Sequence, residues 1–547
     1  MNGRGGQGPP HRFAHRPVVM GRRGVATSAH PLASLAGIQM LLEGGNAVDA
    51  AVAVASALNV VEPFMSGIGG IGLMVLSSAR RRERDVLDFI GRAPRAADPA
   101  RVTAAELEGG PRSCATPGNL GGWLVALERF GTMPRQAVLA PAIRLAEEGV
   151  PLTWKNCEFF ERARPTLTRS AEAQRIYLGN GSPRPGRLLV QKELGATYRQ
   201  VAEGGAEIFY RGPLARAICR AVQEAGGWLA EEDLAGFTPE WRAPLTVPFK
   251  DSEICTVPPP FSAFQYLETL NILEGYGLSG WGHNSADSLH HLIEAVKLAS
   301  ADRLAYAYLP EVPIRGLVSK AYAARQRARI DPRRAGVSEG ERFDPARLPG
   351  QILPGHPADF MSEHTTHFAC ADGDGNVVTV TQTLGVPFGS GFAVPGTGVV
   401  LNNILEWMDL HPESPNLLRP ARKAGTMMSP TQVFRDGQFS MSIGTPGSYG
   451  ILQTTPQMIL NVLEFGMNIQ EAIEAPRIRV YRDRLVDVEG RIPADVRAEL
   501  SRRDHQVNVI EEWSWIVGGG QGITRDPESG ALQGGADPRR DGYALAL

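Results

Sequence analysis

Residues 364–384 constrain the fold most, because they read as one β-hairpin with threonine at its head. Two runs of strand-forming residues, 365–371 and 377–384, flank the turn sequence Asp372-Gly-Asp-Gly-Asn376. Gly with Asn or Asp between two such runs is a strong hairpin signal. A turn centred on Asp374 makes the numbers of cross-strand partners sum to 748, which puts Thr365 opposite Thr383. Two facing hydroxyls add little stability but suit catalysis; the alternative is an ordinary strand with threonines on its wet face.

Further motifs follow one another along the chain. They are Gly24-Val-Ala-Thr-Ser-Ala-His30, Gly44-Gly-Asn-Ala-Val-Asp49, Ser66-Gly-Ile-Gly-Gly-Ile-Gly72, Tyr210-Arg-Gly212, Glu294-Ala-Val-Lys-Leu-Ala-Ser-Ala-Asp-Arg303, Met428-Ser-Pro-Thr431 and Gly534-Gly-Ala-Asp-Pro-Arg-Arg-Asp541. In this order, and with the hairpin, they make the chain resemble the γ-glutamyltranspeptidase family of N-terminal-nucleophile hydrolases. In that family a proenzyme cuts itself before the first Thr of a Thr-Thr-His segment. The resemblance implies an α+β fold, the four-layer αββα sandwich of N-terminal-nucleophile hydrolases, and cleavage between His364 and Thr365.

This cleavage divides the chain into segments with different roles. Residues 1–17 are rich in Gly and Pro and are expected to form a disordered tail. Residues 18–364 would form the large subunit, and residues 365–547, rich in β-strand patterns, the small subunit with the nucleophile at its N-terminus. Residues 330–364 have the composition of a loop, which suits a segment that reaches a processing site. Helices are expected at 31–42, 47–61 after the N-cap Asn46, 120–130, 135–148 and 290–308.

Composition excludes several classes of protein. With 547 residues, 43% hydrophobic content and a net charge of −2, the chain is neither disordered nor a nucleic-acid-binding protein. It has no secretory signal and no apolar run of the ~18 to 20 residues that a membrane span needs, so a cytoplasmic protein without membrane contact is expected. Five widely spaced cysteines without a CxxC pair are expected to be reduced and buried.

Neither a cofactor nor a metal is expected. Residues 67–72 fit GxGxxG, but they follow a helix and precede a strand, the reverse of a dinucleotide-binding order. His290 and His291 are adjacent, so on a helix their side chains diverge by about 100° and do not form a metal pair.

The chemistry expected of Thr365 follows from its place at a new N-terminus. A threonine hydroxyl needs a base, and a free α-amino group with a pKa of about 8 can supply one after cleavage. By resemblance, Thr383 would orient that hydroxyl, and backbone N–H groups at Gly447 and Ser448 would form the oxyanion hole. Ser448 replaces the second glycine of the family's Ser-Pro-Gly-Gly loop. Thr366 is the rival nucleophile, but it would point to the opposite face of the strand.

The sequence departs from the family where γ-glutamyl groups are held. Ile90, Gly385, Ile404 and Met427 stand at positions where the family has Arg, Asn, Gln and Ser. Each lost charge-assisted contact would cost roughly 1.5 to 3 kcal/mol of binding, so the pocket is expected to take another acyl group.

Other side chains are candidates for binding the acyl group. Arg92, Tyr449 and Thr426 are the candidate substrate-binding residues, and an ordinary surface ion pair is the alternative for Arg92. Glu406 and Asp409 are candidates to compensate for the lost amino-group contacts.

The expected function is a self-processing amidohydrolase with a small, carboxylate-bearing, non-glutamyl acyl donor such as oxamate. It would transfer the acyl group to water or an amine, and its two fragments would form a heterodimer, with a dimer of heterodimers left open. Two alternatives stand beside it: a glutathione hydrolase or γ-glutamyltransferase, and an uncleaved, non-catalytic binding or scaffold protein.

Overall fold

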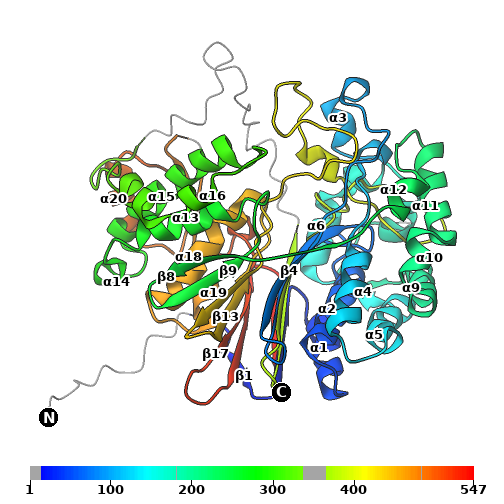
Figure 1. Ribbon diagram of the computed structural model, residues 1–547, viewed down its shortest axis with the longest axis horizontal. Helices are drawn as coiled ribbons and strands as arrows, with labels where there is room; N and C mark the ends of the chain where they lie inside the picture. Colours follow the sequence, from blue (N-terminus) through cyan, green and yellow to red (C-terminus); the bar gives the residue numbers. More distant parts are fainter. Residues whose placement is uncertain (1–13, 180, 337–364, 482) are drawn as a thin grey trace.

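Two seven-stranded antiparallel sheets form the centre of the structure, a computed structural model that describes residues 14–179, 181–336, 365–481 and 483–547 (Figure 1). The first sheet has the order β19 (Tyr543–Ala546), β2 (Gly24–Ser28), β10 (Thr366–Asp372), β11 (Val377–Thr383), β3 (Ile71–Ser78), β4 (Glu83–Phe89) and β7 (Glu240–Arg242). The second sheet has the order β1 (Val19–Gly21), β18 (Leu532–Ala536), β17 (Gln521–Arg525), β13 (Gln438–Gly444), β12 (Thr431–Arg435), β9 (Ser252–Thr256) and β8 (Leu245–Phe249).

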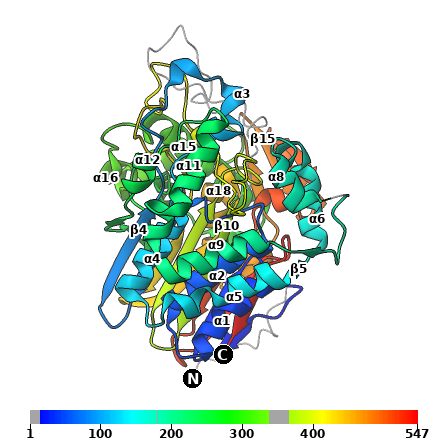
Figure 2. The same ribbon diagram turned by 90° about the vertical axis from the view of Figure 1, so that its right-hand side faces the viewer.

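The sheets pack face to face and are covered by helices on both outer faces. Strands β2 and β10 of the first sheet contact β17 of the second, and β11 contacts β13. The outer face of the first sheet is covered by α1 (Pro31–Leu42), α2 (Ala47–Val61) and α4 (Asn119–Phe130), with α5 (Arg135–Glu148) and α9 (Lys192–Gly204) behind them (Figure 2). The second sheet carries α13 (Phe264–Leu273), α18 (Ile451–Leu463) and α19 (Ile469–Glu474), and α15 (Ala286–Tyr306) packs on α13. This is the expected four-layer αββα architecture.

Smaller elements surround this core. The remaining helices are α3 (Ala104–Leu107), α6 (Trp154–Arg162), α7 (Arg164–Leu167), α8 (Ala171–Ala173), α10 (Ala206–Tyr210), α11 (Pro213–Glu224), α12 (Glu231–Ala235), α14 (Leu278–Trp281), α16 (Ile314–Leu317), α17 (Lys320–Arg327) and α20 (Ala494–Arg502). Strands β14 (Ile478–Val480), β15 (Leu485–Glu489) and β16 (Gln506–Ile510) form a third sheet, and β5 (Val150–Pro151) pairs with β6 (Leu188–Leu189).

The hairpin of β10 and β11 has the register expected from the sequence. Thr366 pairs with Gln382 and Ala371 with Val377, so partner numbers sum to 748. The Asp372 carboxylate closes the turn by accepting hydrogen bonds from the Asp374 and Asn376 amides. The hairpin lies between β2 and β3. Because both neighbours precede residue 364, a cut there would leave the two fragments joined within one sheet.

Local signals also set the first two helices. The Asn46 side chain accepts hydrogen bonds from the Val48 and Asp49 amides, and the Asp49 carboxylate accepts one from the Asn46 amide. This reciprocal capping box starts α2 at the expected residue. All fifteen residues of α2 are buried, because the helix lies between the first sheet and α5. The helix expected at 290–308 starts four residues earlier, at Ala286, after the capping residue Ser285.

Two expectations about the chain are answered here. Residues 14–17, assigned to the disordered tail, are instead attached to the core: the His15 and Arg16 amides donate to the Glu474 carboxylate. All five cysteines are free and buried, as expected. Residues 1–13, most of the loop at 330–364 and His364 lie outside the described residues. None of the described helices combines the length and the apolar composition that crossing a membrane requires.

Candidate active site

Thr365 lies immediately before β10, with only 4% of its surface exposed. Continuing the hairpin register by one residue puts it opposite Thr383, the last residue of β11. Its carbonyl oxygen accepts a hydrogen bond of 3.1 Å from Nη1 of Arg540. A Cβ on Gly70 would lie 2.4 Å from the Thr383 carbonyl oxygen, so the glycine-rich segment allows the chain to approach the hairpin. The sequence predicts the two threonines, but it gives Arg540 no role.

The alternation of side chains along β10 decides which threonine faces the second sheet. His367 lies between the sheets: its Nδ1 is 2.8 Å from the Thr381 hydroxyl, and a Cβ on Gly444 of β13 would lie 2.2 Å from its ring. Thr365 is two residues away and therefore shares this face. Thr366 points the other way, as does its partner Gln382, whose side chain accepts a hydrogen bond from Trp123 on α4.

The candidate oxyanion loop follows β13 at the same end of the sheets. Gly447 has φ 136° and Ser448 has φ 52°, so Ser448 adopts a left-handed conformation that glycine adopts more readily. The loop thus keeps a glycine-type backbone despite the serine. It leads through a 3₁₀ turn, Ser448–Gly450, into α18. The N-terminal end of this helix carries positive partial charge, which favours an anion nearby.

Arg540 connects the loop to Thr365. The Thr445 hydroxyl accepts a hydrogen bond of 2.9 Å from the Gly519 amide. A Cβ on Gly519 would lie 2.8 Å from Cδ of Arg540, whose guanidinium holds the Thr365 carbonyl. The loop, Arg540 and the head of β10 therefore form one packed unit.

A buried carboxyl group lies on the other side of Arg540. Glu62 is 4% exposed, and burial raises its pKa to about 7, although the charge of Arg540 opposes this shift. The Thr366 hydroxyl lies near this carboxyl without a well-formed hydrogen bond to it. Glu62 and Arg540 come from opposite ends of the chain, so sequence spacing gives no sign of their contact.

His367 is not a base. It is completely buried, and burial lowers its pKa to about 3, so the ring is neutral at any working pH. Its hydrogen bond with Thr381 makes it a support for the hairpin.

Three of the positions that depart from the family are buried and apolar. Ile90, Ile404 and Met427 are at most 5% exposed and belong to one hydrophobic cluster that includes Ile451 at the start of α18. None of these side chains can bind a charged group, so these positions supply no contact for a zwitterion.

Gly385 is required by its surroundings. It has φ 109°, and a Cβ there would lie 2.0 Å from Oδ1 of Asn403. That oxygen accepts a hydrogen bond from the Val386 amide. Asn403 therefore occupies the space that a side chain at position 385 would need.

Arg92 lies at the surface. Its side chain is 51% exposed and forms an ion pair of 2.9 Å with Glu240, and it also donates to the Ala421 carbonyl. This geometry favours the surface ion pair over substrate binding.

The remaining candidates have different surroundings. Tyr449 is 38% exposed beside the oxyanion loop. The buried Thr426 hydroxyl accepts a hydrogen bond from the Met428 amide. The Glu406 carboxyl accepts a hydrogen bond from the Asn403 side chain, and the Asp409 carboxyl accepts one from the Ser414 hydroxyl. Burial raises the pKa of both carboxyls, that of Glu406 to about 7.

One cluster in the described part of the chain has the composition of a metal site. Atoms of His290, Glu294 and His505 lie within 4.8 Å of one another. However, Nζ of Lys297 lies 2.8 Å from the Glu294 carboxylate, and the two imidazoles are 2.8 Å apart. A cation is thus already supplied by the protein. The sequence missed this cluster because His505 is distant along the chain.

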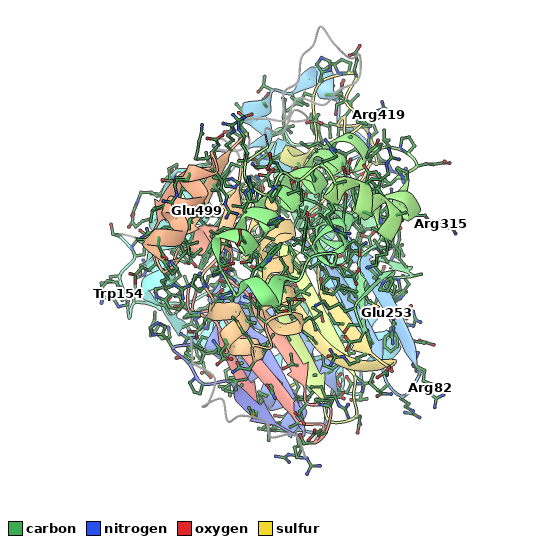
Figure 3. All side chains as sticks on the ribbon, turned by 90° about the vertical axis from the view of Figure 1, so that its left-hand side faces the viewer. Arg82, Trp154, Glu253, Arg315, Arg419 and Glu499 are labelled. Atoms are coloured by element: carbon green, nitrogen blue, oxygen red, sulfur yellow. The ribbon has the colours of Figure 1, made fainter. Side chains whose placement is uncertain are left out.

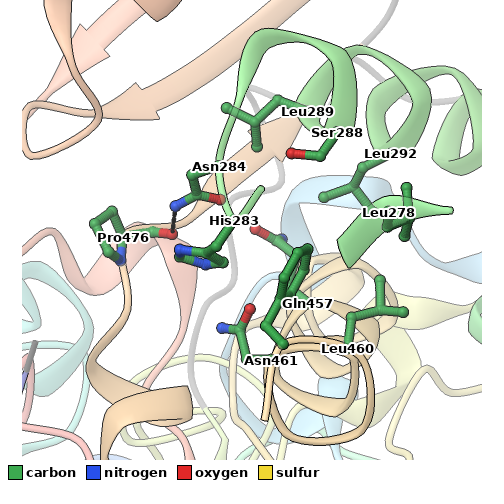
Figure 4. A pocket seen from close by; sticks show the side chains of 11 residues that line it. Leu278, His283, Asn284, Ser288, Leu289, Leu292, Gln457, Leu460, Asn461 and Pro476 are labelled. Atoms are coloured by element: carbon green, nitrogen blue, oxygen red, sulfur yellow. Dashed lines mark hydrogen bonds between the residues drawn. The ribbon is translucent and has the colours of Figure 1, made fainter. Parts of the chain in front are cut away.

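A cavity separate from Thr365 lies between α15 and α18 (Figure 4). Its polar side chains are those of His283, Asn284, Ser288, Gln457 and Asn461, and four leucines, Phe465 and Pro476 line the rest. The Asn284 side chain donates to the Pro476 carbonyl, and burial lowers the pKa of His283 to about 4. None of the expected site residues contributes to it.

Comparison with known proteins adds to this geometry. The family model described as gamma-glutamyltranspeptidase matches residues 33–547. The chain is 33% identical to the glutathione hydrolase proenzyme of Bacillus subtilis (strain 168), over 98% of this chain and 94% of that protein. It is 36% identical to the acylase ACY 1 proenzyme of Pseudomonas sp. (strain SE83), over 96% and 94%. The crystal structure of cephalosporin acylase from Bacillus halodurans superposes with a TM-score of 0.87 at 32% identity, covering 99% of both chains.

Proposed function

Since this chain belongs to the γ-glutamyltranspeptidase family and is an enzyme of that family, we propose that it is a self-processing amidohydrolase with Thr365 as nucleophile. The observation that carries this assignment is the placement of Thr365. It lies opposite Thr383, on the face of β10 that looks toward the second sheet. Arg540 connects it to the loop that contains Gly447 and Ser448.

Self-cleavage would create the catalyst. The Thr365 hydroxyl attacks the carbonyl carbon of His364, the peptide C–N bond breaks, and an ester forms. Water hydrolyses this ester, which leaves a carboxylate on His364 and a free amino group on Thr365. With its carbonyl fixed by Arg540, the new N-terminus keeps its position.

Turnover would use the same groups. The α-amino group takes the proton of the Thr365 hydroxyl as its oxygen attacks the substrate amide. The N–H groups at Gly447 and Ser448 stabilise the oxyanion, with help from the N-terminal end of α18. The amine leaves with a proton, and water or another amine takes the acyl group. Thr383 orients the attacking hydroxyl.

We propose a small, carboxylate-bearing, non-glutamyl acyl donor, of which oxamate is the shortest example. The buried apolar side chains of Ile90, Ile404 and Met427 and the space taken by Asn403 support this choice. The second candidate is a glutathione hydrolase, which the B. subtilis relative favours. The cut fragments would stay together as a heterodimer, because strands from both share the first sheet, and we place the enzyme in the cytoplasm.

Intact-mass measurement tests self-cleavage. Purified protein should consist of fragments 1–364 and 365–547, while Thr365→Ala should remain one inactive chain. Thr366→Ala, which removes the threonine of the opposite face, should still be cut. An uncut wild type with full activity would exclude the mechanism.

A substrate panel tests the acyl group. γ-Glutamyl-p-nitroanilide and glutathione should be poor substrates beside short carboxylate-bearing amides. Efficient glutathione hydrolysis would replace the first candidate by the second.

A further inference from the structure

Arg303, at the C-terminal end of α15, is a buried arginine that has no anionic partner among the described residues. It is 8% exposed. Its Nε donates a 2.7 Å hydrogen bond to the neutral amide oxygen of Gln265 on α13. The N–H groups of Nη1 and Nη2 form no hydrogen bond or ion pair with any described residue. A buried charge is normally paired, because moving a charged group out of water without a partner costs much free energy.

Two other buried arginines show what such pairing looks like in this protein. Arg477 lies 2.6 Å from the Asp537 carboxylate, and Arg539 lies 2.6 Å from that of Glu489. All four side chains are fully buried. Arg303 is nearly as deep but faces an aromatic ring, and no carboxylate of the described residues pairs with it, so its guanidinium is available to an anion.

The place of Arg303 points to the active site as the source of that anion. Its guanidinium carbon lies 4.5 Å from the ring centre of Tyr449, which directly follows Ser448 in the oxyanion loop. Tyr449 is 38% exposed, so this stacked pair borders open space beside the loop. Tyr308, two residues beyond α15, is close to both Arg303 and Tyr449, and a Cβ on Gly425 would lie 2.1 Å from its ring. Arg303 therefore lies beside the oxyanion loop and close to the segment before Thr426.

We propose that Arg303 binds the carboxylate of the acyl donor, so that the preferred substrates are half-amides of dicarboxylic acids. The two Nη atoms present parallel N–H groups, which match the two oxygens of a carboxylate. Stacking on Tyr449 and the hydrogen bond to Gln265 hold the guanidinium plane in place. The proposal rests on the proposed function and deepens it, because it names the residue and the chemical class that select the donor.

The test compares charged and neutral donors of the same shape. Self-cleaved wild-type enzyme is first assayed with the p-nitroanilide half-amides of dicarboxylic acids of two to six carbons. The best of these is then compared with its methyl ester. We expect wild type to prefer the acid by about 10²-fold in kcat/KM, as for a charge-assisted contact. Arg303→Met should lose this preference because its kcat/KM falls for the acid, while its kcat/KM for the ester changes less than threefold.

Two further variants control for charge and folding. Arg315→Met removes an exposed arginine on the neighbouring helix α16 (Figure 3) and should keep the full preference. Arg303→Lys keeps the charge but loses the paired donors, so its preference should fall by about tenfold. If Arg303→Met is not cut, as judged by intact mass, Arg303→Lys decides in its place.

An unchanged preference for the acid in Arg303→Met, or in Arg303→Lys where that variant decides, would overturn the assignment. Failure of the proposed function would look different. Wild type itself would then prefer γ-glutamyl-p-nitroanilide or a neutral acyl amide to every half-amide, which would overturn both.

Discussion

Replacing Gly385 by Asn, the residue that the family has there, should damage the fold without restoring glutathione hydrolysis. The backbone has φ 109°, and a new Cβ would lie 2.0 Å from Oδ1 of Asn403. That oxygen now accepts a hydrogen bond of 2.9 Å from the Val386 amide, and it would have to move away and break this bond. The change therefore combines an unfavourable backbone conformation with the loss of a buried hydrogen bond.

The magnitude follows from these two terms. A left-handed conformation costs a residue with a side chain about 1 to 2 kcal/mol. Leaving a buried amide unpaired costs about 1 to 3 kcal/mol more. We therefore expect Gly385→Asn and Gly385→Ala to lower the free energy of unfolding by about 2 to 5 kcal/mol.

Urea denaturation followed by tryptophan fluorescence measures this loss, in the Thr365→Ala background so that one chain unfolds. Gly466→Ala is the matched control, because Gly466 has φ 67° but nothing lies within 4 Å of the added Cβ. It should lose the backbone term alone. A loss at Gly385→Ala no larger than at Gly466→Ala would refute the clash, and glutathione hydrolysis by Gly385→Asn at ordinary family rates would refute the account of the pocket.

Four further outcomes are expected. Thr383→Ala should keep the fold but lose about 1 to 3 kcal/mol of stability, because the Gly385 amide loses the hydroxyl to which it donates. It should also slow both self-cleavage, followed by intact mass, and amide hydrolysis by about 10²-fold; unchanged rates would remove its orienting role. Burial raises the pKa of Glu62 from 4.5 to about 7, so its stabilising protonated form is fully present below pH 4.5 and is lost as pH rises through 7. The difference in free energy of unfolding between wild type and Glu62→Gln should therefore fall by about 3 kcal/mol from pH 4.5 to pH 7. A difference that does not change with pH would contradict the raised pKa. Arg92→Ala should retain kcat/KM within twofold and lose at most about 1 kcal/mol of stability, as for an exposed ion pair; a large activity loss would return Arg92 to the site. Ser448→Gly should relieve the left-handed backbone and raise the free energy of unfolding by up to about 1 kcal/mol with turnover within twofold, and lower stability would mean that the serine side chain supports the loop.

Much of the fold can be read from local sequence. The register of the hairpin follows from the turn at Asp374, and the start of α2 follows from the capping residue Asn46. Such signals act between residues a few positions apart, where chain geometry leaves few alternatives. The order of the motifs indicates the family, and the sandwich follows from the family.

Some features of the candidate site also follow from local sequence, and others depend on the tertiary structure. Alternation along one strand already separates Thr365 from Thr366 in the sequence. The tertiary structure added which layer each face of the strand meets. His367, on the face of Thr365, contacts the second sheet, and Gln382, on the face of Thr366, contacts the helical layer.

Only the tertiary structure decided how charges are paired. Arg92 was a candidate for binding the substrate until folding brought Glu240 within 2.9 Å of it. Arg540, near the end of the chain, holds the carbonyl of Thr365 and lies beside Glu62. Arg303 meets Tyr449 and no carboxylate among the described residues. The sequence specified these side chains, but their partners come from elements far apart in the chain, and the strength of each interaction depends on burial and distance, which only packing determines.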